Sequence, residues 1–344
     1  MTIELSNVTF TQQTDVIPAF GIEDIVNTGI ANTLAGNDQI SGTVEEGGVG
    51  IFNSGVGIFN RGNINSGDGN DSITGTGAVT DPGMFGIGIF NQGSGSSSPT
   101  SPVSINSGNG NDSIIGTGNA FGIFNWEDIN TGSGNDTITG IGGSTGIKNY
   151  YYSPYYYPSS YYPRINTGDG NDEIIGTGVV AIENDGLIST GNGNDSIIAN
   201  GYFQNYGGVS LGDGNDSIIT TGNMHNGGTI SAGKGNDSIT VYGSFNREGY
   251  GLGVELGDGN DYFYGFGDGS GFNGESGTDT LELPPGSYTI EIPFTTVVTF
   301  TEDSTFISPS QKAIMYTSGF EKLIAGGTTY NFSSFTNGQT LVVT

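Results

Sequence analysis

One acidic motif recurs along most of the chain. The stretches SGDGNDSIT (66–74), TGDGNDEII (167–175) and LGDGNDSII (211–219) share the order Gly-x-Gly-Asn-Asp. Carboxylate oxygens repeated in this way are ligands for hard cations, and the motif holds no Cys or His for softer metals. Nine aspartates end a copy, and a tenth ends the degenerate copy GESGTDTL: Asp38, Asp71, Asp112, Asp136, Asp172, Asp195, Asp216, Asp237, Asp261 and Asp279.

The spacing of these aspartates predicts a repeat fold. Successive gaps are 33, 41, 24, 36, 23, 21, 21, 24 and 18 residues, so the basic unit has 21–24 residues and some copies carry insertions. Each unit contains three short strand patterns separated by glycine turns, and helical periodicity is not found. A unit this small buries its apolar side only by stacking on its neighbours. We therefore expect an all-β protein, a parallel β-solenoid of about nine coils over residues 36–281.

Period-2 alternation assigns the faces of the strands. Isoleucine or phenylalanine recurs two residues after the motif aspartate, as in Ile73, Ile197 and Phe263, and this position is predicted to point inward. The intervening position is mostly Ser or Thr and is predicted to point outward. A second inward column is expected in the third strand of each coil: Ile105, Ile129, Ile165, Ile188, Val209, Ile230 and Val254.

Stacking puts one motif aspartate per coil at the same corner, about 4.8 Å from the next. Two unit charges at that distance repel by roughly 0.9 kcal/mol even in water, and by more in a protein. Such a column requires cations, and the flexible set of carboxylate and backbone oxygens suits Ca²⁺ better than Mg²⁺. A tight turn of Asn, Asp and Gly is the preferred explanation for a single copy, but not for nine that all keep the aspartate. Four further aspartates three residues earlier are added as candidate ligands: Asp68, Asp169, Asp213 and Asp258.

The corner resembles the RTX (hemolysin-type) calcium repeat, whose pattern is G-G-x-G-x-D-x-U-x. The resemblance covers about residues 36–281 and implies that loops of adjacent coils bind Ca²⁺ ions with the aspartate and backbone oxygens. The first glycine of that pattern is often replaced here, by Ser66, Ser107, Thr131, Thr167 or Leu211. Only one motif falls in each coil, so one calcium row is expected rather than two.

Composition narrows the class of protein. The formal charge is −28 with only seven basic residues, so we expect repulsion from nucleic acid and attraction for cations. There is no Cys, and no apolar run long enough to span a membrane. The start of the chain, MTIELSNVTFTQQTDV, lacks the features of a Sec signal peptide. Residues 1–35 are expected to form an N-terminal cap and a degenerate first coil.

Glycine thins from residue 282 onward and longer strand patterns appear, which predicts a small antiparallel C-terminal β cap over 282–344. This segment is similar to C-terminal regions of RTX-like proteins in cyanobacteria, where such an end carries a type I secretion signal. The resemblance implies a secreted or cell-surface protein, whereas a cap without an export role is the alternative.

Asparagine ends the middle strand of most coils, which predicts a ladder of amides at a second corner. The positions are Asn53, Asn60, Asn91, Asn125, Asn149, Asn184, Asn205, Asn226 and Asn246. Insertions at 92–104 and 150–164 leave this corner, and the second is rich in tyrosine. Together with the outward phenylalanines of the early coils it predicts an aromatic contact surface, unless the insertion folds down and covers them. The surface comprises Tyr150, Tyr151, Tyr152, Tyr155, Tyr156, Tyr157, Tyr161, Tyr162, Phe52, Phe59, Phe90 and Phe124.

Three functions are compatible with these features. The favoured hypothesis is a secreted, non-catalytic, calcium-binding structural protein or adhesin, which self-associates or binds a surface glycan through the Tyr/Phe edge. A polysaccharide-active enzyme is the second, but the basic residues are scattered, His225 stands alone and no HExxH motif occurs. Ice binding is the third, through the outward column Asn65, Asn106, Asn130, Asn166, Ser189, Ser210, Ser231 and Glu255.

Overall fold

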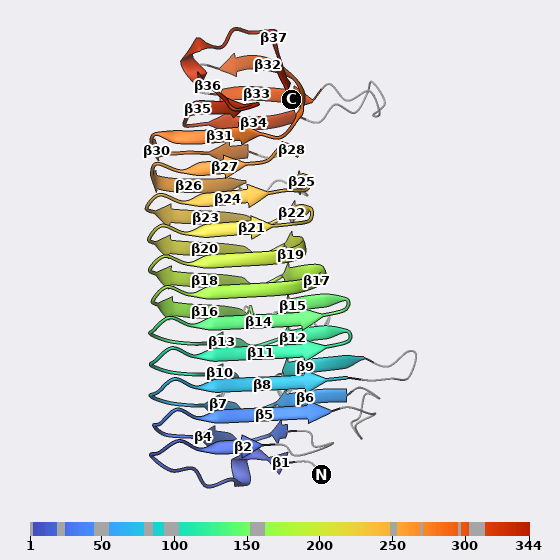
Figure 1. The fold of residues 1–344 in the computed structure, drawn as a ribbon, viewed down its shortest axis with the longest axis vertical. Coiled ribbons are helices and arrows are strands. Elements are labelled where there is room, and N and C mark those ends of the chain that lie inside the picture. Colours follow the sequence, from blue (N-terminus) through green and yellow to red (C-terminus); the bar gives the residue numbers. More distant parts are fainter. Residues whose placement is uncertain are drawn as a thin grey trace.

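The computed structural model describes residues 3–18, 25–44, 55–78, 85–92, 103–151, 162–247, 253–268, 271–294, 297–302 and 314–344. Its strands are stacked into a tall solenoid with the antiparallel cap at one end (Figure 1). The predicted all-β class, the parallel β-solenoid and the antiparallel C-terminal cap are confirmed.

Each coil contributes one strand to each of three parallel stacks. The first stack follows the Gly-x-Gly-Asn-Asp corner and pairs coil to coil in register, as Ser72 pairs with Ser113 and then Thr137. It contains β2 (Val16–Pro18), β5 (Gln39–Val44), β8 (Ser72–Gly77), β11 (Ser113–Gly118), β14 (Thr137–Gly142), the first halves of β17 (Glu173–Asn184) and β19 (Ser196–Asn205), β21 (Ser217–Thr220), β24 (Ser238–Val241), β27 (Tyr262–Tyr264), β31 (Asp279–Leu283) and β35 (Phe320–Ala325).

The second stack returns along the coil after a turn. It contains β1 (Ile3–Glu4), β3 (Ile25–Asn27), β6 (Gly55–Asn60), β9 (Gly86–Asn91), β12 (Phe121–Asn125), β15 (Thr145–Asn149), the second halves of β17 and β19, β22 (Met224–Asn226), β25 (Phe245–Arg247) and β28 (Gly267–Asp268).

The third stack leads back to the aspartate corner and lies behind the first in Figure 1. It contains β4 (Ile30–Asn32), β7 (Asn63–Asn65), β10 (Ser104–Asn106), β13 (Asp128–Asn130), β16 (Arg164–Asp169), β18 (Leu187–Asn192), β20 (Gly208–Asp213), β23 (Thr229–Lys234), β26 (Val254–Gly259), β29 (Gly271–Asn273) and β34 (Ile314–Ser318), and the short β30 (Ser276–Gly277) also pairs with β26.

The core is a set of inward columns along the solenoid axis. Ile73, Ile114 and Ile138 stack in the first column and are no more than 1% exposed, as predicted. The third-stack column, which includes Ile105 and Ile230, is equally buried. Each coil therefore covers the apolar side chains of its neighbours, which a single coil could not do.

Glycine in the early coils lets the first two strands approach closely. A Cβ atom added to Gly75 would lie 2.2 Å from the carbonyl oxygen of Gly88. In later coils Ala199, Thr220 and Val241 take the place of these glycines in register. The close approach of these two strands is therefore a feature of the early coils, since larger residues stand at this position later.

Both ends of the solenoid are covered. At the N-terminal end the 3-10 turn η1 (Leu5–Asn7) places the fully buried Leu5 in the core cluster. At the other end β32 (Gly286–Phe294) pairs antiparallel with β33 (Val297–Glu302) and β37 (Gln339–Val343), and β35 pairs antiparallel with β36 (Thr328–Asn331), which leads into η2 (Phe332–Ser334).

Candidate metal centre and surface sites

The aspartate corner contains two glycines in each of the coils from Asp71 to Asp261. Gly67 and Gly69 have φ angles of 94° and 142°, a region that L side chains rarely adopt. A Cβ atom on Gly108 would lie 1.7 Å from the carbonyl oxygen of Gly67 in the preceding coil. The Gly-x-Gly pattern therefore follows from both the backbone conformation and the close stacking of corners.

The asparagine of the motif links each coil to the next on the outside of the corner. The side-chain Oδ1 of Asn37 accepts a hydrogen bond from the backbone N–H of Asn70, at 2.9 Å. The same bond recurs along the edge to Thr278, with lengths of 2.7–3.0 Å. This role explains the asparagine without a metal.

The motif aspartate links coils in the opposite direction, on the inside. Oδ1 of Asp71 accepts a hydrogen bond from the backbone N–H of Asp38 in the preceding coil, at 2.7 Å. The remaining predicted column aspartates do the same at 2.7–2.8 Å. All ten are at most 2% exposed. The structure thus brings the ten predicted inner aspartates together in one buried column.

The second oxygen of these aspartates is the unusual feature of the corner. Within the described part of the chain, Oδ2 of each of the ten is buried and has no hydrogen-bond partner. An asparagine could accept the backbone hydrogen bond equally well, so Oδ1 alone does not explain the choice of aspartate. A buried carboxylate oxygen without a donor costs free energy, which a cation or a proton would offset.

Burial makes these carboxyl groups hold protons more tightly than usual. Desolvation, with a smaller contribution from neighbouring aspartates, raises the pKa of Asp71 to about 6. Desolvation also raises the pKa of Asp136, Asp237 and Asp279 to about 6 and that of Asp216 to about 7. The pKa values of Asp112, Asp172, Asp195 and Asp261 are raised for the same reason. Without a cation, part of the column is therefore protonated near neutral pH.

The column extends further than sequence reasoning indicated. The backbone N–H of Asp15 donates to Asp38, and the carboxylate of Asp15 accepts hydrogen bonds from the N–H and hydroxyl of Thr11. At the other end Oε2 of Glu321 accepts the backbone N–H of Asp279 at 2.8 Å. The similarity of TDVI (14–17) to NDSI, and Gly319 before Glu321, are the signals that could have shown these ends.

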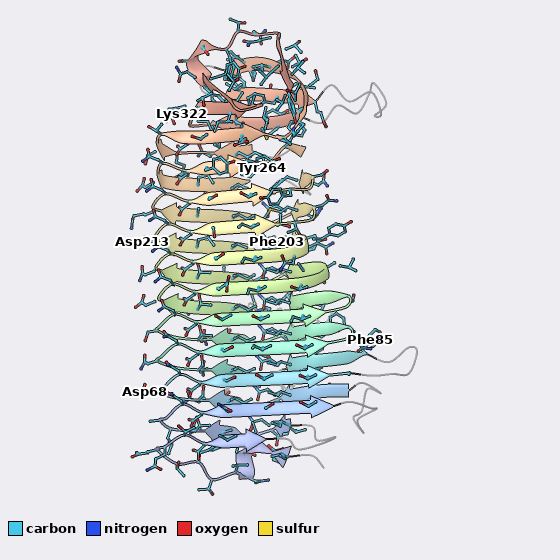
Figure 2. All side chains as sticks on the ribbon, viewed as in Figure 1. Asp68, Phe85, Phe203, Asp213, Tyr264 and Lys322 are labelled. Atoms are coloured by element: carbon cyan, nitrogen blue, oxygen red, sulfur yellow. The ribbon has the colours of Figure 1, made fainter. Side chains whose placement is uncertain are left out.

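The four outer aspartates do not join this column. They are exposed on the same edge, where Asp68 and Asp213 lie in Figure 2. Asp68 accepts a hydrogen bond from Asn109, Asp169 from Asn192, Asp213 from Lys234 and Asp258 from Ser276, at 2.6–2.9 Å. The strand register aligns these four aspartates in one column on the surface. No two of them lie in adjacent coils, because Asn, Ser or Lys occupies the same position in the coils between them.

The inner column fits an oxygen-ligated cation, with one condition. Among the described residues no group of three or more His, Cys, Asp or Glu side chains converges as a metal site. A cation at this corner would therefore need backbone, hydroxyl or water oxygens beside the carboxylates, and these are ligands that Ca²⁺ accepts.

The aromatic surface is partly as predicted and partly covered. Phe59, Phe90 and Phe124 stack along the second stack with ring centroids 5.1–5.4 Å apart. Trp126 packs edge-on against Phe90 and Phe124 at 5.2 and 5.5 Å, and Phe90 is only 7% exposed. The prediction that Phe90 is exposed is therefore wrong, because neighbouring rings cover it.

The tyrosine insertion is described only at its two ends. Tyr150 lies 6.1 Å from the ring of Phe124, and Tyr151 stacks on the exposed Tyr162 at 4.7 Å. The amine of Lys148 lies 4.7 Å from the ring centre of Tyr150 and forms an ion pair with Glu183 at 2.6 Å. Phe52, Tyr152, Tyr155, Tyr156, Tyr157 and Tyr161 lie outside the described residues.

The predicted asparagine ladder exists at the second corner. Seven buried side-chain bonds of 2.7–2.9 Å run from Asn27 through Asn60, Asn91, Asn125, Asn149, Asn184 and Asn205 to Asn226. Asn246 is not a member: it is exposed and pairs with His225, because Phe245 stacks on Met224. Asn53 lies outside the described residues.

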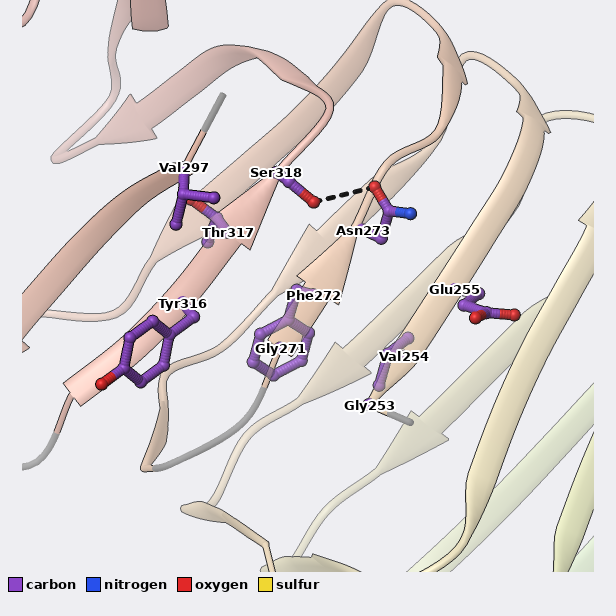
Figure 3. A pocket seen from close by; sticks show the side chains of 10 residues that line it. All are labelled: Gly253, Val254, Glu255, Gly271, Phe272, Asn273, Val297, Tyr316, Thr317 and Ser318. Atoms are coloured by element: carbon purple, nitrogen blue, oxygen red, sulfur yellow. Dashed lines mark hydrogen bonds between the residues drawn. The ribbon is translucent and has the colours of Figure 1, made fainter. Parts of the chain in front are cut away.

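A shallow groove of about 230 Å³ lies where the solenoid meets the cap (Figure 3). A Cβ atom on Gly271 would meet nothing within 4 Å, and Ser318 donates a hydrogen bond to Asn273 at 2.9 Å. Glu255 is its one ionisable carboxylate. The lining residues are Gly253, Val254, Glu255, Gly271, Phe272, Asn273, Val297, Tyr316, Thr317 and Ser318.

No protein-family model and no curated protein matches the sequence. Among solved structures, the chain is similar to a hyperactive, Ca²⁺-dependent, beta-helical antifreeze protein from an Antarctic bacterium. The identity is 22%, the match covers 82% of this chain and 77% of that chain, and the TM-score is 0.42. No helix in the described ranges is long and apolar enough to cross a membrane.

Proposed function

We propose that the protein is a calcium-stabilised β-solenoid of the RTX type, in which the inner aspartate column binds several Ca²⁺ ions. The observation that carries the proposal is the column of ten buried carboxylates, each with one oxygen that lacks a hydrogen-bond partner among the described residues. The ligands would be Asp38, Asp71, Asp112, Asp136, Asp172, Asp195, Asp216, Asp237, Asp261 and Asp279, completed by neutral oxygens.

The bound ions would act by neutralising charge. Each gap between coils would gain about two positive charges, which offsets the repulsion along the column and much of the formal charge of −28. The exposed Asp68, Asp169, Asp213 and Asp258 would contribute surface charge, since they already accept hydrogen bonds from neighbouring coils.

A calcium titration tests this proposal. The chain is stripped with EDTA at pH 8 and followed by far-UV circular dichroism as Ca²⁺ is added. We expect a weak β signal in EDTA, because the ionised column opposes stacking, and a full signal on addition of Ca²⁺. Mg²⁺ is the matched control and should restore less, because it demands a rigid octahedral site. An unchanged β signal up to about 10 mM Ca²⁺ would sink the proposal.

We further propose a non-catalytic structural or adhesive role outside the cell, with type I secretion as the export route. Stacking ladders occupy most of the repeated polar residues, and the groove of Figure 3 offers one carboxylate rather than an acid–base pair. The contact surface would be the aromatic face formed by Phe59, Phe85, Phe121, Phe124 and Trp126 of the early coils.

Substitutions at the exposed edge of this face test the adhesive role. Phe85 is 57% exposed and its ring lies 6.2 Å from that of Phe121. We expect Phe85→Ser to weaken self-association or glycan binding without lowering stability. Tyr202→Ser, at a similarly exposed position of a later coil, is the control. Equal effects of the two substitutions would count against a localised aromatic surface.

Ice binding remains the second candidate, because the outward third-stack column is regular. Asn65, Asn106, Asn130 and Asn166 follow one another in register, and Ser189, Ser210 and Ser231 continue the column to Glu255. Thermal hysteresis of the calcium-loaded protein separates this candidate from a structural role.

A further inference from the structure

A second buried column runs beside the aspartates. It consists of hydroxyl side chains, each of which donates a hydrogen bond to the backbone carbonyl of the same position in the next coil. Thr131 donates to Thr167 at 3.1 Å, and Thr190 donates to Leu211 at 2.8 Å. Every member is at most 1% exposed: Thr33, Ser66, Ser107, Thr131, Thr167 and Thr190.

Each of these hydroxyl groups precedes the aspartate of its own coil by five residues and lies beside it. The hydroxyl of Ser66 acts to lower the pKa of Asp71, and that of Thr167 acts to lower the pKa of Asp172. The same holds for Ser107, Thr131 and Thr190 with their aspartates. A hydroxyl has one proton, so when the carbonyl receives it the oxygen keeps lone pairs that can bind a cation held by the neighbouring carboxylate.

The hydroxyl column stops after Thr190. The strand register places Leu211, Ala232 and Leu256 at the same position in the following coils, and all three are fully buried. The unpartnered oxygens of Asp216, Asp237 and Asp261 therefore have an apolar residue where the earlier coils have an oxygen. The asparagine ladder of the opposite corner ends at Asn226, soon after the hydroxyl column does.

We propose that the column contains two kinds of calcium site, tighter ones in the coils of Asp38 to Asp195 and weaker ones in the coils of Asp216 to Asp261. The inference rests on the proposed function and assigns the hydroxyl oxygens as additional ligands. Ca²⁺ takes six to eight oxygens, and its affinity follows the number and charge of the ligands. A hydroxyl supplies one more protein oxygen per coil, whereas leucine supplies none.

The test is calorimetric titration of Ca²⁺ into the stripped full-length chain, compared among variants. Thr167→Val with Thr190→Val removes two hydroxyls and keeps the side-chain shape. Leu211→Thr adds one hydroxyl to the late coils. Ser189→Ala, at the neighbouring outward position, is the control. We expect two affinity classes that differ by roughly tenfold or more. The double variant moves ions from the tight to the weak class, Leu211→Thr moves ions in the opposite direction, and Ser189→Ala moves none.

A second readout keeps the test decisive if the double variant folds poorly. Amide hydrogen exchange at limiting Ca²⁺ should show the strands from β20 to β27 losing protection before those from β8 to β18. The inference is overturned if calorimetry gives a single affinity class in all variants and hydrogen exchange is uniform along the solenoid. That result would leave the proposed calcium binding unaffected. No bound calcium at all overturns the proposed function as well.

Discussion

At the scale of single residues, the evidence for a metal site is that the corner uses aspartate where asparagine could make the same hydrogen bond. Both can accept the backbone hydrogen bond that Oδ1 of Asp195 receives from Asp172. Only aspartate adds a charged second oxygen, and in Asp195 that oxygen is buried. Asp195 therefore has two roles. Its hydrogen bond stabilises the stacking of coils without a metal, whereas its buried charge needs a cation.

The substitution Asp195→Asn separates these two roles. It keeps the Oδ1 acceptor and removes the charge, so in chelator at pH 6 we expect unchanged or higher stability. In saturating Ca²⁺ we expect a loss of at least about 1 kcal/mol, because a charged ligand is missing. Thermal unfolding with and without Ca²⁺ measures both. An equal loss in the two conditions would mean that the charge serves no cation.

The pH dependence of the metal-free chain follows from the raised pKa values. Asp136 titrates at about 6 and Asp216 at about 7 in the folded chain, against 3.8 for an ordinary aspartate. The folded state therefore binds more protons than the unfolded state, so this contribution to stability is complete below about pH 4 and lost as the pH rises through 6–7. In EDTA, unfolding temperatures should fall from pH 5 to pH 8.

Calcium should abolish this fall, because the ion replaces the proton on the carboxylates. Unfolding temperatures in saturating Ca²⁺ provide the comparison. A metal-free chain that is as stable at pH 8 as at pH 5 would contradict the buried, uncompensated column.

At the scale of the element, the corner is limited by backbone geometry. Leu34 occupies the place of the first corner glycine with φ of 77°, and Gly212 has φ of 112° at the equivalent place. We expect Leu34→Gly to stabilise the chain by about 1 kcal/mol, because it relieves a left-handed conformation. We expect Gly212→Ala to destabilise it by more than about 3 kcal/mol, since its Cβ would lie 1.8 Å from the carbonyl oxygen of Gly191.

Gly271→Ala is the matched control for these changes, because a Cβ there meets nothing within 4 Å. Chemical denaturation of the calcium-loaded variants measures all three. If Gly212→Ala and Gly271→Ala cost the same, the corner is not the rigid element described here.

Much of the coil was predictable from the sequence. A residue type that recurs at the same place in each coil indicates which face of the strand it lies on and which residues stack on it. The inward isoleucines and most of the asparagine ladder are examples. Residue type alone predicts a ladder position for Asn246, but the strand register aligns Phe245 with Met224 and so puts Arg247 at the ladder position. In the sequence the hydroxyl column appears only as residues that replace the first glycine of the RTX pattern. Its hydrogen bonds join different coils and depend on the fold.

At the scale of the whole molecule, the solenoid is a stack whose polar contacts are mostly between coils. Asparagine ladders at two corners and hydroxyls in the early coils connect neighbours without a metal. Among the ladders in the described ranges, the aspartate column is the one whose charge opposes stacking. Its ends were not predicted, because Asp15 and Glu321 lie in degenerate copies that pair with the column only in the fold.

The calcium content of the folded chain tests this account most directly. Equilibrium dialysis followed by elemental analysis, with circular dichroism on the same sample, gives the number of ions per folded chain. We predict several tightly bound ions for the natural sequence and fewer for Asp195→Asn. A chain that is fully folded at pH 8 with less than one bound Ca²⁺ would contradict the account, because its ionised carboxylates would then need no cation.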